Sequence, residues 1–431
     1  MVNVLLISWH DDCIMSSMLT VNVNKYDMKW IIFMKNKIYK KSMTKGVGSM
    51  KKTLLLMGAL ILSIILVYGY ADAISGACSN CHTMHNSQGG DPVDGAGPNQ
   101  QLLNNSCVAC HTTSTGQTNG TSNAPAVLHT TNPGGQGAGK TNAGGDFYWV
   151  NGGADAKGHN VVGIAGADIA IGVEPPGFDQ TATASLTFDS KTLQVTGGAG
   201  WAGKQLTCSG TFGCHGTRDQ EGFGGLSGAH HGNTDGTATQ ASSPTTIGNS
   251  FRFLAGIKGL ENSGWNWGET ASAHNEYYGV NSVSSRQYDA GSTSYANTGT
   301  ISFLCAECHG EFHALIANDS SYASGDPWRR HPTDIALLSS GETSKYNTSD
   351  GSSIGSYSLE APVARTSVPA TSSSTVTAGT DIVMCLSCHR AHGSDQNDLL
   401  RWSYSNMVAG GSNSGGCFVC HTDKNASGIN P

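Results

Sequence analysis

The chain has little charge and few aromatic side chains for its length. Of its 431 residues, 13% are charged and 7% are aromatic, whereas 57 are glycine. The formal net charge is −7, and nucleic acid binding requires a basic face, so that class of function is disfavoured. A glycine-rich chain with few large apolar side chains builds an ordinary core poorly, and this composition alone would suggest disorder. A folded chain of this kind needs something besides side chains to form its core.

Long apolar runs are also scarce. The run Leu54–Val67 is shorter than the roughly 20 residues that a membrane-spanning helix requires. Lys51 and Lys52 precede this run and an Ala-Asp-Ala sequence follows it, which is the pattern of a cleaved signal peptide at 50–73. The pattern predicts a protein that is exported through the periplasm and secreted to the cell surface.

The signal peptide divides the chain into segments. Signal peptides begin near their charged region, yet residues 1–49 precede this one. We interpret 1–49 as a start-site extension outside the fold, with Met50 as a plausible start. Residues 74–431 are expected to form a single domain.

Cysteine is almost confined to one recurring pattern. Twelve of the 13 cysteines lie in six motifs in which histidine directly follows the second cysteine, and the remaining one, Cys13, lies upstream of the signal peptide. Five motifs have the strict form Cys-x-x-Cys-His, and the sixth, CSGTFGCH at 208–215, is stretched. In this c-type haem attachment pattern, two thiols bond covalently to the haem vinyl groups and the adjacent imidazole binds the iron. The predicted thioether residues are Cys78, Cys81, Cys107, Cys110, Cys208, Cys214, Cys305, Cys308, Cys385, Cys388, Cys417 and Cys420, and the predicted proximal iron ligands are His82, His111, His215, His309, His389 and His421.

Two other uses of paired cysteines compete with haem. The cysteines of a secreted chain can form a disulfide framework, and Cys-x-x-Cys pairs can bind zinc. Neither requires histidine directly after every second cysteine, and the whole chain has only 16 histidines. The sequence therefore predicts six covalently bound haem c groups, whose apolar plates can serve as the core.

The second axial ligand of each iron is expected to be histidine. Only Met84, Met384 and Met407 lie downstream of the signal peptide, which is too few for six haems. Nine histidines lie outside the motifs in this region, so the counts favour bis-histidine haems of low reduction potential. The candidate distal ligands are His85, His129, His159, His230, His231, His313, His331 and His392, with His274 the weakest of the nine.

Three of these histidines follow a proximal histidine closely. His85 and His392 come three residues after His82 and His389, and His313 comes four residues after its motif histidine. A residue this near cannot easily reach round to the opposite face of the same haem, but it can reach the iron of a neighbouring haem. One peptide turn would then hold two haems together in a close stack.

Several segments outside the bare motifs resemble a known family. The resemblance lies in CSNCHTMHNS at 78–87, GGDFYWV at 144–150, GHN at 158–160, RRHP at 329–332 and CLSCHRAH at 385–392. These segments, in this order, resemble the extracellular multihaem c-type cytochromes of metal-respiring bacteria, in particular the hexahaem members that polymerise into nanowires.

The resemblance implies a continuous stack of bis-histidine haems and a bond between subunits. It implies a homopolymer in which His85 ligates the haem at Cys385, Cys388 and His389 of the next subunit. The stretched third motif and the C-terminal residues past the last motif depart from the family. We expect the companion ligand of the third haem to come from AHHG at 229–232.

The expected fold is mostly irregular and loop-rich, with few short helices and a minor β-hairpin around the haem stack. Alternation predicts the hairpin at 185–195, and helical spacing predicts short helices at 303–316 and 398–408. The Ser/Thr-rich segment 339–380 is interpreted as a surface loop rather than a domain linker.

These features together predict an extracellular electron-transfer protein and not an enzyme. It would pass electrons along six bis-histidine haems, as a filament, between outer-membrane partners and extracellular metal oxides or other cells. One alternative is a monomeric carrier in the periplasm or at the outer surface. A multihaem reductase is a further alternative, but it needs an open iron position, and the chain has no Cys-x-x-Cys-Lys motif.

Overall fold

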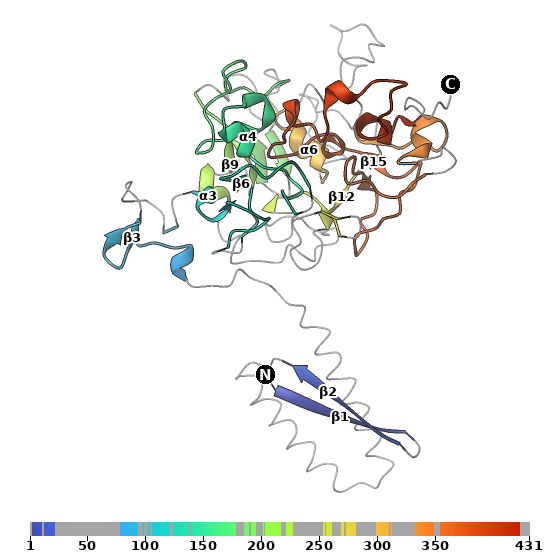
Figure 1. The fold of residues 1–431 in the computed structure, drawn as a ribbon. Coiled ribbons are helices and arrows are strands. Elements are labelled where there is room, and N and C mark those ends of the chain that lie inside the picture. Colours follow the sequence, from blue (N-terminus) through green and yellow to red (C-terminus); the bar gives the residue numbers. More distant parts are fainter. Residues whose placement is uncertain are drawn as a thin grey trace. The chain divides into compact units, whose positions relative to one another are not determined.

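The computed structural model divides the chain into two compact units, Met1–Ala71 and Asp72–Pro431 (Figure 1). In the first unit, β1 (Val2–His10) pairs antiparallel with β2 (Cys13–Val21). The predicted signal peptide at 50–73 lies outside the described residues. The structure describes residues 2–10, 13–21, 78–93, 98, 102–103, 106–120, 124–137, 139–177, 185–188, 191–194, 201, 203–216, 221–226, 253–254, 256–260, 269–270, 273–281, 299–309, 312, 331, 333–348 and 354–422.

The second unit is built from loops joined by very short helices and strands, as its composition predicts. Its described α-helices are α3 (Cys107–Cys110), α4 (Tyr148–Asn151) and α6 (Ile301–Ala306). Its 3-10 turns are Cys78–Asn80, Asp155–Lys157, Gly222–Leu226, Glu342–Lys345, Cys385–Ser387, Asn397–Leu399, Tyr404–Asn406 and Gly416–Val419. Its strands are β3 (Ser87–Gln88), β4 (Asp91–Pro92), β5 (Thr112–Thr113), β6 (Leu128–His129), β7 (Ser185–Phe188), β8 (Lys191–Gln194), β9 (Thr207–Ser209), β10 (Gly213–His215), β11 (Gly259–Leu260), β12 (Glu276–Tyr278), β13 (Ile335–Ala336), β14 (Ala364–Arg365) and β15 (Ile382–Val383).

One sheet of five short strands gathers distant parts of the second unit. Its strand order is β11-β12-β14-β15-β13, with β12 and β14 parallel and the other neighbours antiparallel. The other described pairs of this unit are two-stranded: β3-β4 and β7-β8 are antiparallel, and β5-β6 and β9-β10 are parallel. The sheet places β15, which leads directly into the motif at 385–389, between β14 and β13, and joins it through β14 to the earlier strands β12 and β11.

Two of the predicted local elements are present. The hairpin forms from β7 and β8, with Ser185 opposite Gln194. The helix predicted at 303–316 begins two residues earlier, at Ile301, because the Thr300 hydroxyl accepts a hydrogen bond from the Phe303 amide and caps it at 3.1 Å. This helix, α6, ends at Ala306, and most of the predicted remainder lies outside the described residues.

The helix predicted at 398–408 is wrong. The segment contains only two 3-10 turns, because Asp398 and Leu399 adopt φ angles of 58° and 57°, which a right-handed helix does not allow. This backbone shape lets Leu400 pair with His389 in an isolated β-bridge. Contacts with the haem motif thus override the helical spacing of the side chains.

The interpretation of 339–380 as a surface loop is also wrong. Tyr346 is fully buried, and its hydroxyl donates a hydrogen bond of 2.7 Å to the carbonyl of Ala361. Together with Val363, Val376 and Trp402, it forms a hydrophobic cluster against which the cysteines at 388, 417 and 420 pack. The Ser/Thr-rich segment is therefore part of the core that supports the last two motifs.

A buried ion-pair network ties this segment to the five-stranded sheet. The Arg365 guanidinium on β14 contacts Glu276 on β12 at 3.0 Å and also pairs with Asp381. Glu276 in turn lies 3.3 Å from His274, whose ring stacks on Tyr357 with centroids 3.9 Å apart. Burial raises the pKa of Asp381, and its hydrogen bonds and Arg365 only partly oppose this effect.

Candidate haem-binding site

The five strict motifs share one backbone turn. In each, the amide of the histidine donates a hydrogen bond to the carbonyl of the first cysteine, four residues earlier. The donor–acceptor distances are 2.8 Å at His82, 3.0 Å at His111, 2.9 Å at His309, 3.1 Å at His389 and 2.9 Å at His421. This single closed turn is short enough to present both sulfurs and the imidazole to one bound group.

The stretched motif brings its two cysteines together with two short strands in place of the single turn. Cys208 on β9 and Cys214 on β10 lie on two parallel strands joined by a tight turn at Gly210, where φ is 83°. At Gly213 a Cβ atom would lie 2.5 Å from the Ser209 amide nitrogen, so only glycine fits this close approach. The extra residues are taken up by the turn, and the two cysteines remain neighbours.

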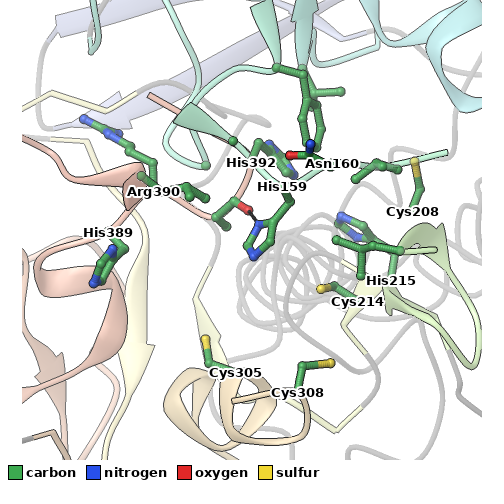
Figure 2. Close-up of a pocket in the computed structure, with 18 of the residues that line it drawn as sticks. His159, Asn160, Cys208, Cys214, His215, Cys305, Cys308, His389, Arg390 and His392 are labelled. Carbon is green, nitrogen blue, oxygen red and sulfur yellow. Dashed lines mark hydrogen bonds between the residues drawn. The ribbon is translucent and has the colours of Figure 1, made fainter. Parts of the chain in front are cut away.

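All six motifs contribute to one cavity of about 1690 Å³. Figure 2 shows part of it, with residues of the third, fourth and fifth motifs arranged around one space. Apolar side chains such as Val161, Leu304 and Leu386 complete the wall. The motif cysteines that line it are Cys78, Cys81, Cys107, Cys110, Cys208, Cys214, Cys305, Cys308, Cys385, Cys388 and Cys417, and the lining histidines are His82, His111, His159, His215, His309, His331, His389 and His392.

The thiols follow one another through space in chain order. Cysteines of different motifs lie close enough to shift one another's pKa values: the first motif and the second through Cys81 and Cys110, the second and the third through Cys107 and Cys208, and the fourth and the fifth through Cys305 and Cys385. The third and fourth motifs are close enough for Cys214 to contribute to the raised pKa of Cys305. Burial, and then repulsion from Cys417, raises the pKa of Cys388 to about 12, which links the fifth motif to the sixth.

The motif cysteines are free thiols in this structure. None of the twelve motif cysteines forms a disulfide. Within the described part of the chain, no group of three or more His, Cys, Asp or Glu side chains is arranged to hold a metal ion by itself.

Four of the six motif histidines, and His159 outside the motifs, are oriented by backbone carbonyls. A carbonyl oxygen only accepts, so the imidazole Nδ1 must carry the proton, and Nε2 keeps the electron pair that a metal needs. Burial lowers the pKa of His159 to about 4, which also favours the neutral ring. The Nδ1–oxygen distances are 3.3 Å from His82 to Leu102, 2.8 Å from His111 to Pro125, 2.7 Å from His309 to Pro176, 2.7 Å from His389 to Asp398 and 2.7 Å from His159 to Ala391. The sequence does not reveal these acceptors, because any residue supplies a carbonyl.

Three motif histidines lie near a second histidine ring. The ring centroids are 6.2 Å apart for His215 and His392, 6.3 Å for His309 and His159, and 6.0 Å for His421 and His331. Metal–imidazole bonds of about 2 Å on opposite sides of one iron place two ring centroids roughly 6 Å apart. The three centroid separations match this value.

Other predicted distal ligands have different positions. His85 is exposed, in a turn where its φ is 56°, and His230, His231 and His313 lie outside the described residues. The expectation that AHHG at 229–232 supplies the companion of the third motif lies outside the described residues. Among the described residues, the His392 ring lies near that of His215.

Both ring nitrogens of His129, a predicted distal ligand, have hydrogen-bond partners in this structure. Its Nδ1 lies 2.7 Å from the Asp146 carboxylate, and its Nε2 lies 2.9 Å from the Gly116 carbonyl. The side chain is buried but does not line the cavity. Both ring nitrogens are used to join β6 to neighbouring loops, so no electron pair faces an iron.

Residues 376–426 match the family described as the doubled CXXCH motif, and they contain the fifth and sixth motifs. The chain is related to the multihaem c-type cytochromes. This motif binds haem c covalently, so covalent haem belongs to this chain.

A solved structure also resembles the chain, with a low overall similarity. It is the outer membrane cytochrome S filament from Geobacter sulfurreducens, which is 19% identical over 78% of this chain and 85% of that chain, with a TM-score of 0.38. No curated protein gives a significant match. Among the described residues, no helix combines the length and the apolar character needed to cross a membrane.

Proposed function

We propose that the chain is a secreted electron-transfer protein that holds six haem c groups with histidine on both sides of each iron. The observation that carries this proposal is the cavity lined by cysteines of all six motifs, together with three motif histidines whose rings lie near a second histidine ring. When bound, haem c takes up and releases single electrons. Residues 50–73 would serve as the signal peptide, and 74–431 would form the single haem-bearing domain.

The geometry supports an assignment of three axial pairs. His392 would complete the site of the stretched motif, His159 that of the motif at 305–309, and His331 that of the motif at 417–421. With histidine on both sides, the iron has no open position for a small molecule. This arrangement favours electron transfer over the reductase alternative.

The fifth motif supports assembly of the chain into a homopolymer. His389 donates its Nδ1 hydrogen to the backbone carbonyl of Asp398, which leaves its Nε2 for an iron. His85, which is exposed, would reach this position from a neighbouring copy. The filament would then connect outer-membrane partners with metal oxides or other cells.

Alanine substitution of His392 and of His129 should separate a ligand from a structural residue. His392→Ala is expected to leave all haems attached but to convert one haem per chain to a high-spin form, because one axial position opens. His129→Ala is expected to keep every haem low-spin while the free energy of unfolding falls by about 3–5 kcal/mol, as the buried Asp146 loses its partner. Electron paramagnetic resonance and chemical unfolding measure the two effects. A high-spin signal in His129→Ala alone would reverse the two assignments.

The proposed function is tested by electron microscopy and absorption spectroscopy of the protein sheared from cells. Intact mass should show six haems, the spectrum should be low-spin throughout, and the particles should be filaments. Discrete particles with the same spectrum would establish a monomeric carrier in place of the filament. A substantial high-spin fraction in the unmodified protein would contradict bis-histidine ligation and support the reductase.

A further inference from the structure

Two buried arginines, Arg390 and Arg401, lie beside the fifth motif. Arg390 directly follows the motif histidine and lines the cavity, on the same side as His389 in Figure 2. Arg401 donates from Nε to the carbonyl of Leu386 at 2.7 Å and to that of His389 at 3.1 Å. The side chains of the two arginines are 5% and 1% exposed, so water screens neither charge effectively.

Only one described carboxylate compensates these two cations. Glu269 lies 2.5 Å from Arg390 and 3.7 Å from Arg401, and its side chain is 6% exposed. Arg390 also donates to the carbonyl of Ala143 at 2.8 Å, but its Nε is buried without a hydrogen-bond partner. Asp398 contacts His389 through its backbone carbonyl, and because this residue is exposed, solvent weakens the effect of its carboxylate. The cluster of Arg390, Arg401 and Glu269 therefore carries one excess positive charge.

An excess positive charge affects a redox centre held beside it. The reduced form of the centre carries one more negative charge than the oxidised form, so a nearby cation stabilises it. This interaction is stronger inside a protein than in water, because the effective dielectric constant is lower. The reduction potential of an iron centre depends on such charges around it as well as on its ligands.

We propose that the cluster of Arg390, Arg401 and Glu269 raises the reduction potential of the haem carried by Cys385, Cys388 and His389. The proposal rests on the proposed presence of haem at this motif. Arg390 and Arg401 act here as positioning and charge-setting residues and need not touch the iron. Within a conduit, a haem of raised potential is the site where an electron resides longest.

Spectroelectrochemical titration of the full haem-loaded protein tests this proposal. Arg390→Gln is expected to shift the reduction equilibrium of one haem about tenfold toward the oxidised form, which is about 59 mV for a one-electron couple. Glu269→Gln keeps both cations and removes the anion, so it is expected to shift the same haem by a similar amount in the opposite direction. Both shifts should persist at high ionic strength, because the groups are buried.

Lys140→Gln provides the matched control. Lys140 is exposed and bonds only to the carbonyl of Gly134 among the described contacts, so the same loss of charge should leave every potential unchanged. Equal potentials in Arg390→Gln and the unmodified protein, or a downward shift in Glu269→Gln, would overturn the proposal. If the Arg390→Gln protein does not accumulate in cells, the reduction potential of the haem in Glu269→Gln tests the proposal alone, and it is expected to rise.

Peptide mass spectrometry separates failure of this inference from failure of the proposed function. A haem-modified peptide containing Cys385 and Cys388 together with unchanged potentials would reject the electrostatic role only. An unmodified peptide in the unmodified protein would reject haem at this motif, and the electrostatic role with it.

Discussion

Without covalent haem attachment, the second unit, Asp72–Pro431, is expected to remain unfolded. The cavity that the six motifs surround measures about 1690 Å³, and empty cavity volume costs about 24 cal/mol per Å³, or on the order of 40 kcal/mol for a rigid cavity of this size. Collapse and entry of water reduce this cost, but a quarter of it already equals the 5–15 kcal/mol by which domains are stable. Haem must therefore supply much of the core.

Expression with and without the haem attachment machinery measures this effect. The haem-free chain should show no cooperative thermal transition and should be degraded rapidly by added protease, whereas the loaded chain should resist. A haem-free chain with a cooperative transition and native-like protease resistance would show that the side chains alone form the core.

Removal of a single haem should lower the melting temperature, and the decrease should be larger where the cysteines of the motif are more closely packed. Cys388 packs against the cluster that contains Tyr346, whereas Cys78 is exposed. Serine substitution of both cysteines in the motif at 385–389 is therefore expected to lower the melting temperature more than the same change at 78–82. The two double variants are matched controls, because each removes one haem and two sulfurs.

The motif turns and the hairpin could be predicted because local sequence determines them. In the turn at 385–389, the two thiols and the imidazole are brought together by a hydrogen bond spanning four residues. The hairpin at 185–195 likewise needs only alternation and a turn. In neither case does a distant part of the chain have to be known.

Features that depend on distant contacts could not be predicted in this way. His129 and His392 are both plain histidines in the sequence, and only Asp146 and His215, brought close by the fold, distinguish their surroundings. Tyr346 lies in a Ser/Thr-rich segment whose composition suggests exposure, yet its partners are residues of the core. Periodicity at 398–408 failed for the same reason, since Asp398 is held by its contact with His389.

His85→Ala is expected to abolish assembly while all six haems remain attached. Under the proposed function, His85 supplies the second ligand to the iron held by His389 of the next copy, so each subunit contact includes a metal–ligand bond. Its exposure suits this role, and its φ of 56° directs the chain through a tight turn at the same point. Loss of the imidazole should also leave one haem per chain high-spin.

Met84→Ala is the matched control, because Met84 precedes His85 and is 71% exposed but is not needed as a ligand. Size-exclusion chromatography with light scattering and electron microscopy should show filaments for the unmodified chain and Met84→Ala, and single subunits for His85→Ala. Added imidazole should restore the low-spin spectrum of His85→Ala without restoring filaments, because a small ligand fills the iron position but joins no chains. Filaments of normal length in His85→Ala would show that apolar packing alone joins the subunits, and the bridge through His85 would be rejected.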